Sequence, residues 1–84
     1  MEELKIANAQ PREAARQKAT QNAAEILLEI RSKRGISQAR LAEISGRKQS
    51  YISRVESRQQ NISLATLQEI VDAVGGNLVV KVEL

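Results

Sequence analysis

The chain contains no cysteine and no histidine. Without cysteine it cannot form a disulfide, and it offers no thiolate as a nucleophile or a metal ligand. Without histidine as well, zinc sites, iron sites and histidine-based acid–base catalysis lose the residues they usually need. The ten acidic residues are scattered over polar positions and do not form a catalytic group. The composition therefore predicts a protein that is not an enzyme and that holds no metal and no cofactor.

Aromatic residues and long apolar runs are also scarce. The 84 residues include no phenylalanine and no tryptophan, and Tyr51 is the single tyrosine. A chain this short forms one small domain that buries only about 60% of its unfolded surface, and such a domain gains stability from oligomerising. Residues 1–20 contain no apolar run that fits a signal peptide or a membrane span. Together with the lack of cysteine, this predicts a cytoplasmic protein.

Positive charge is concentrated in the middle of the chain. The net charge is +3, but residues 31–60 carry eight lysines and arginines against two glutamates, a local net charge of +6. Residues 21–30 and residues 61–84 each contribute −2. A basic segment between acidic flanks is typical of a protein that binds a polyanion.

Helix signals divide the chain into three parts. From Arg12 the sequence is rich in residues that favour a helix, and an apolar stripe at helical spacing follows before Gly35 ends this first helix. Ser37 and Ser63 are good N-caps for two of the later helices. The predicted parts are a polar, weakly structured arm with the start of the first helix at residues 1–20, a helical domain at residues 21–75, and a C-terminal strand at residues 76–84.

Two short predicted helices, residues 37–45 and 48–57, are joined by a turn that contains Gly46. Two amphipathic helices joined in this way form a helix-turn-helix, whose second helix can enter the major groove of DNA. Ile52 and Val55 face inward from the second helix, and the opposite face carries side chains that can bond base edges. An ordinary solvated helix face is the alternative. The predicted base-reading residues are Lys48, Gln49, Ser50, Ser53 and Arg54.

The stretch ISQARLAEISGRKQSYISRVESRQQNISLATLQEIVDAVG resembles the Cro/cI-like (XRE-type) helix-turn-helix family. The resemblance covers about residues 26 to 75 and implies a mainly α, lambda-repressor-like bundle of four to five helices. It is carried by Gln38, Leu41, Ala42, Gly46, Gln49, Ile52, Ser53, Arg54, Glu56, Asn61, Ser63, Leu64 and Leu67.

The family resemblance also implies roles for single residues. Gln38 is expected to bind a phosphate and to support the reading helix. Arg31 and Glu56 are expected to form a partly buried ion pair, with two separately solvated charges as the alternative. Contacts with the DNA sugar–phosphate backbone are expected from Ser37, Gln38, Arg47, Tyr51, Arg58 and Asn61.

Three positions depart from the family pattern. Lys48 stands where many members have a serine or threonine cap, so the predicted helix at residues 48–57 is expected to be capped differently. Arg40 stands at a position that is commonly acidic, and it cannot close a capping box on Ser37. Arg58 replaces a common glycine, so this turn either holds a non-glycine residue at positive φ or is rearranged.

The C-terminal segment, Asn77–Leu84, alternates apolar and polar residues in the manner of a β-strand. No earlier segment has this pattern, so the expected partner is the same strand of a second copy, paired antiparallel across a two-fold axis. Its apolar face is expected to lie on the helices. A disordered tail and addition to another protein's sheet are the alternatives. The predicted homodimer residues are Leu78, Val79, Val80, Val82 and Leu84.

The long polar lead-in AQPREAARQKATQNAAEILLEIRSKRGISQ and the closing segment AVGGNLVVKVEL together resemble the HigA-type antitoxins of type II toxin–antitoxin systems. HipB-type antitoxins share the helix-turn-helix followed by a strand, and they have a Lys-Gln pair like Lys48-Gln49. This resemblance implies a dimer that binds a palindromic operator in its own promoter and neutralises a toxin encoded by a neighbouring gene. Residues 1–20 are then the candidate toxin-binding segment. A plain repressor without a toxin partner is the main alternative, and an interaction module that does not bind DNA is another.

Overall fold

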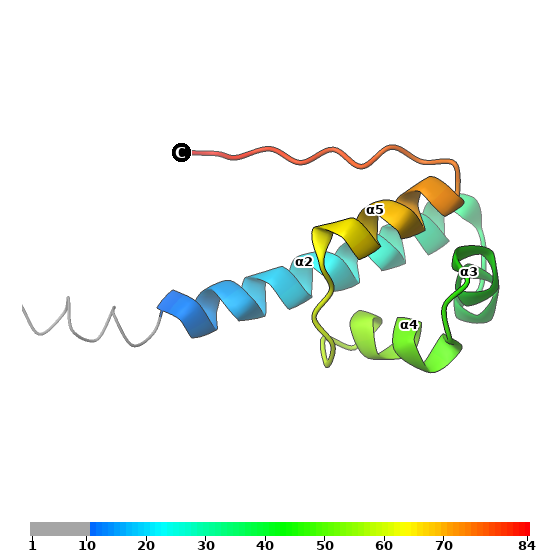
Figure 1. The fold of residues 1–84 in the computed structure, drawn as a ribbon, viewed down its shortest axis with the longest axis horizontal. Helices are drawn as coiled ribbons and strands as arrows, with labels where there is room; N and C mark the ends of the chain where they lie inside the picture. Colours follow the sequence, from blue (N-terminus) through cyan, green and yellow to red (C-terminus); the bar gives the residue numbers. More distant parts are fainter. Residues whose placement is uncertain (1–10) are drawn as a thin grey trace, which may run out of the picture.

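The computed structural model describes residues 11–84, which form four α-helices followed by an extended segment (Figure 1). The mainly α, helix-turn-helix fold predicted from the sequence is confirmed for these residues. No helix among them combines the length and the apolarity needed to cross a membrane. The helices are α2 (Pro11–Arg34), α3 (Gln38–Ser45), α4 (Gln49–Glu56) and α5 (Leu64–Ala73).

The helix ends follow from local chemistry. The Ser37 hydroxyl accepts a hydrogen bond from the Arg40 N–H at 3.0 Å and begins α3, and the Ser63 hydroxyl accepts from the Thr66 N–H at 3.0 Å and begins α5. Gly46, with φ of 69°, ends α3 in the left-handed conformation that glycine adopts without a steric penalty. Both predicted caps and the predicted Gly46 turn are therefore confirmed.

The structure shows how the chain accommodates Lys48 and Arg58, two of the three departures from the family pattern. Lys48 is the N-cap residue of α4 and makes no side-chain capping hydrogen bond. Arg58 adopts φ of 65°, and its N–H still bonds to the Val55 carbonyl at 3.1 Å. Of the two alternatives for this turn, the non-glycine residue at positive φ is the correct one. Such a conformation costs an ordinary side chain about 1–2 kcal/mol.

A small aliphatic core holds α3 and α4 at a fixed angle. The C-terminal half of α2 packs on α4, α4 packs on α3, and α3 packs on α5. The largest fully buried side chains are Leu27, Leu41, Ile52, Val55 and Ile70. Complete burial of each of them contributes about 1.5–3 kcal/mol to stability, so the angle between α3 and α4 is set by the core and not by their short turn.

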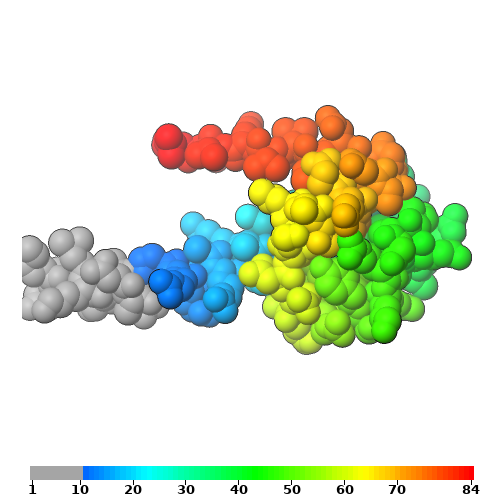
Figure 2. Space-filling view, viewed as in Figure 1, coloured from blue at the N-terminus to red at the C-terminus, as the bar shows by residue number. Residues whose placement is uncertain are grey.

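The N-terminal half of α2 extends beyond this bundle (Figures 1 and 2). Residues 11–19 are exposed to solvent, and burial begins around Thr20 and Ala23. Residues 11–20 are helical, in line with the helix formers from Arg12 onward. The start of the first helix, which the sequence places from Arg12, is therefore confirmed. The rest of the arm expected at residues 1–20, residues 1–10, lies outside the described residues.

The C-terminal segment turns back after Gly75-Gly76 and runs beside α5 (Figure 1). Residues 77–84 belong to no strand within the described part of this single chain. Leu78 packs against the core, but Val80 and Val82 remain 64% and 77% exposed. In one copy, the apolar face expected to lie on the helices is thus covered only at Leu78. The strand and its pairing remain predictions about a second chain.

Candidate nucleic-acid interface

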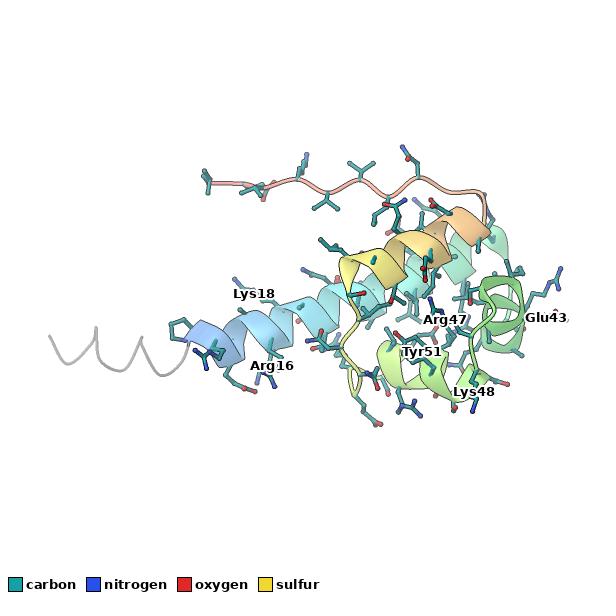
Figure 3. The ribbon with its side chains drawn as sticks, in the orientation of Figure 1. Arg16, Lys18, Glu43, Arg47, Lys48 and Tyr51 are labelled. Atoms are coloured by element: carbon teal, nitrogen blue, oxygen red, sulfur yellow. The ribbon has the colours of Figure 1, made fainter. Side chains whose placement is uncertain are left out.

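The outward face of α4 is polar and exposed to solvent. Because Ile52 and Val55 are buried against the core, the side chains on the opposite side of the helix point to solvent. Figure 3 shows Lys48 extending away from the other helices at the start of α4. The structure brings all five predicted base-reading residues to this exposed surface: Lys48, Gln49, Ser50, Ser53 and Arg54.

A chain of side-chain hydrogen bonds connects α2, α3 and α4 behind this face. Arg31 Nη1 lies 2.7 Å from Glu56 Oε1, so the ion pair expected from the family resemblance is present. Gln38 Nε2 donates to the same Glu56 oxygen at 2.9 Å. Gln49 Nε2 donates to Gln38 Oε1 at 3.4 Å. The Glu56 side chain is only 7% exposed, so its charge depends on these two donors.

This network orients Gln38 through its 2.9 Å bond to Glu56, and its long, exposed bond to Gln49 restrains that side chain only weakly. Each carboxamide has two N–H donors and one oxygen acceptor. Gln38 uses one N–H on Glu56 and its oxygen on Gln49, which leaves its second N–H for another acceptor. Gln49 uses one N–H and retains its oxygen and its second N–H. That remaining pair matches the donor and acceptor that glutamine needs to bond adenine.

Arg47 and Tyr51, two of the predicted backbone-contact residues, lie against each other. Arg47, in the turn between α3 and α4, forms an ion pair with Glu69 of α5. Its Cζ atom lies 6.0 Å from the centre of the Tyr51 ring, and Figure 3 shows these two residues close together. A partly exposed ion pair is worth no more than about 1 kcal/mol. Exchange of Glu69 for a phosphate therefore costs Arg47 little.

The remaining predicted backbone-contact residues lie at two places. Ser37 caps α3, where its hydroxyl already accepts the Arg40 N–H. Arg58 and Asn61 are exposed in the loop between α4 and α5, and both line a polar groove of about 310 Å³. Arg16 of α2 lines the same groove.

The sequence pattern predicted no site role for Arg16. A signal existed, because Arg16, Thr20, Ala23 and Leu27 recur at helical spacing. Leu27 and Ala23 are buried in the core, so Arg16 lies on the extension of the face that packs on the bundle.

A second, more apolar groove of about 400 Å³ lies between the C-terminal segment and the helices. Leu78 and Val79 form one wall. Residues of α2 and the end of α5 form the other, among them Ile26, Ile30, Val71 and Val74.

Acidic side chains do not form a metal site in residues 11–84, where no group of three potential ligands gathers.

Comparison with known protein families gives one result. A family model described as helix-turn-helix (HTH_3) matches residues 27–80, which is more than half of the chain. The matched region begins in the packed half of α2 and includes α3, α4, α5 and the first part of the C-terminal segment. Comparisons with curated proteins and with solved structures give no match.

Proposed function

Because the chain belongs to the helix-turn-helix family, we propose that it is a sequence-specific DNA-binding antitoxin and autorepressor. As a dimer it binds a palindromic operator and neutralises a cognate toxin. The coarser role, a DNA-binding transcriptional regulator and not an enzyme, is the one that family membership supports. The observation that carries the DNA-binding proposal is the exposed polar face of α4, held by the core and by the Arg31–Glu56–Gln38–Gln49 network.

In this proposal α4 enters the major groove and its outward face reads bases. Gln49 can bond adenine, and Arg54 and Lys48 can bond guanine, while Ser50 and Ser53 can donate or accept at either base. A side chain that is already held in place loses less conformational entropy when it binds. Gln38 is held in this way by Glu56, and the 3.4 Å bond from Gln49 to Gln38 adds a weaker restraint.

Contacts with the phosphates would come from both sides of α4. Ser37, Gln38 and Arg47 precede the helix, and Arg58 and Asn61 follow it. Contacts at both ends fix the position of the helix along the groove, but they carry no base information. Tyr51 belongs to the same proposed set.

A homodimer would cover the apolar side chains of the C-terminal segment and would match a palindromic operator. An exposed row of valines with unpaired backbone groups is a surface that another chain can pair with. Pairing with the same segment of a second copy would cover Val79, Val80, Val82 and Leu84, which are all exposed in one copy. A two-fold dimer could place its two α4 helices about 34 Å apart, in successive major grooves of a palindrome.

The antitoxin part of the proposal rests on the two ends of the chain. Residues 11–20 form an exposed helix that projects from the bundle, so it is accessible to a partner protein. We propose that residues 1–20 bind the toxin. A plain repressor would need no such segment, and it explains every DNA-binding feature equally well.

Co-purification distinguishes these two functions. The tagged chain is expressed from its native locus with both neighbouring genes intact, and the masses of the eluted proteins are measured. A stoichiometric small protein that stops growth when expressed alone would support the antitoxin. A homodimer of this chain alone would favour the plain repressor.

A further inference from the structure

The polar groove beside the α4–α5 loop has a composition that suits an anion. Arg58, Gln59 and Asn61 line it from the loop, and Glu13, Arg16, Gln17 and Thr20 line it from α2. It is about 310 Å³ in volume. It therefore joins the projecting half of α2, which has no part in the helix-turn-helix itself, to residues that directly follow α4.

Within residues 11–84, neither arginine of this groove, Arg16 or Arg58, takes part in a salt bridge, whereas Arg31, Arg40 and Arg47 each do. Each guanidinium offers five N–H donors in a planar arrangement that matches phosphate oxygens. Glu13 is the single acidic residue in the groove, so the lining carries a net charge of about +1 by this count.

The groove also lies on the side of α2 that is nearer α4. In Figure 3, Arg16 and Lys18 extend from opposite sides of the helix, and Arg16 is on the side nearer α4. The loop that contains Arg58 and Asn61 leaves the C-terminal end of α4. If α4 occupies the major groove, the DNA backbone at its edge passes this loop.

We propose that the groove between Arg16 and Arg58 binds a phosphate of the operator backbone. The projecting half of α2 is then a third DNA-contacting element beside α3 and α4. This inference rests on the proposed DNA-binding function, and it adds a contact that the helix-turn-helix alone does not supply. An acidic segment of a protein partner is the competing occupant.

The chain offers matched variants for a test. Arg16→Ala and Lys18→Ala each remove one positive charge from exposed positions on the same helix, but only Arg16 lines the groove. Glu13→Gln removes the negative charge from the groove. All three replacements are good helix formers, so circular dichroism should show the same helix content as in the wild type.

The experiment measures the dissociation constant of the full chain for an operator selected from random duplex DNA, over a series of salt concentrations. Removal of one phosphate contact lowers the slope of log K against log salt by about 1. We expect Arg16→Ala to lower the slope in this way and to weaken binding about tenfold, the effect of one charged hydrogen bond. Lys18→Ala should alter binding less than twofold, and Glu13→Gln should strengthen it.

Three results would overturn the proposal. If Arg16→Ala and Lys18→Ala weaken DNA binding equally, the groove holds no phosphate, although the proposed function stands. If Arg16→Ala leaves DNA binding intact but releases a co-purifying protein, the groove belongs to that partner. If the wild-type chain binds no duplex DNA, the proposed function fails first, and this inference fails with it.

Discussion

The helix-turn-helix unit and the C-terminal segment differ in whether their side chains find partners within the chain. In the unit, Glu56 is almost buried and is paired inside the chain by Arg31 and Gln38. In the segment, Val80 and Val82 are mostly exposed, and residues 77–84 join no strand within the described part of the chain. The first region pairs its buried charge within the chain, whereas the second leaves its apolar side chains exposed in a single copy. Variants in the first region should therefore lower the free energy of unfolding, and variants in the second should weaken association between chains.

The largest effect is expected from breaking the internal pairing at Glu56. Glu56→Ala leaves Arg31 partly buried without its partner, and such a loss typically costs about 3–5 kcal/mol of the free energy of unfolding. Urea unfolding at a fixed protein concentration measures this cost. Glu43→Ala is the control, because Glu43 pairs with Arg40 at an exposed site and should cost less than about 1 kcal/mol. Equal losses would show that the buried network adds no special stability.

The next effect tests the external pairing of the tail. Val80→Asp with Val82→Asp places two charges on the proposed strand pair and should raise the dimer dissociation constant roughly a hundredfold or more, since each buried valine contributes about 1.5–3 kcal/mol. Sedimentation equilibrium measures it, and circular dichroism should retain the four helices.

Lys81→Asp is the matched control for that double variant. It changes the net charge by the same amount but acts on the opposite face of the alternating segment. If both variants dissociate equally, net charge and not the apolar face controls the association. A wild-type monomer would refute the strand pairing.

A third prediction sharpens the difference between base and phosphate contacts. Arg54→Ala should cost about 1–3 kcal/mol of binding free energy and relax specificity at one operator position, if Arg54 reads a base. Arg58→Ala should weaken all sequences alike and lower the salt dependence. Binding to a set of single-base operator variants measures both. Uniform weakening by Arg54→Ala would move Arg54 to the phosphate set.

The smallest expected effect concerns the turn after α4. Arg58→Gly relieves the positive φ and should raise the free energy of unfolding by up to about 1 kcal/mol, while it weakens DNA binding. Arg54→Gly is the control, since glycine inside a helix costs about 1 kcal/mol. Urea unfolding should therefore give opposite signs for the two variants. A destabilised Arg58→Gly would mean that the arginine side chain contributes more than its backbone strain costs.

The features predicted correctly from the sequence depend on local chemistry or on a family pattern. Ser37, Ser63 and Gly46 end or begin helices through bonds with residues only a few positions away, so their roles are visible in the sequence. The Arg31–Glu56 pair spans 25 positions and is expected only because the family resemblance implies it.

Other features needed the folded chain. The first turns of α2 have no apolar stripe, so only the helix formers from Arg12 onward predict them, and nothing in the pattern shows that they project from the bundle. The packed half of α2 supplies the helical nucleus, and the alanines at positions 14, 15 and 19 extend it. The groove that joins Arg16 to Arg58 depends on tertiary packing between distant positions, which no local pattern contains. The partner proposed for the C-terminal segment is a second copy, which the pattern of a single chain does not describe.

The length of α2 fixes how far its exposed end lies from the core. The helix runs without interruption from Pro11 to Arg34, and its sequence has no glycine and no proline after the first position. At 1.5 Å per residue, its exposed end stands roughly 24 Å from Leu27 in the core. The helix thus acts as a spacer of fixed length. In the proposed antitoxin, a toxin bound at this tip would lie at the far end of the spacer and would leave the outward face of α4 free for DNA.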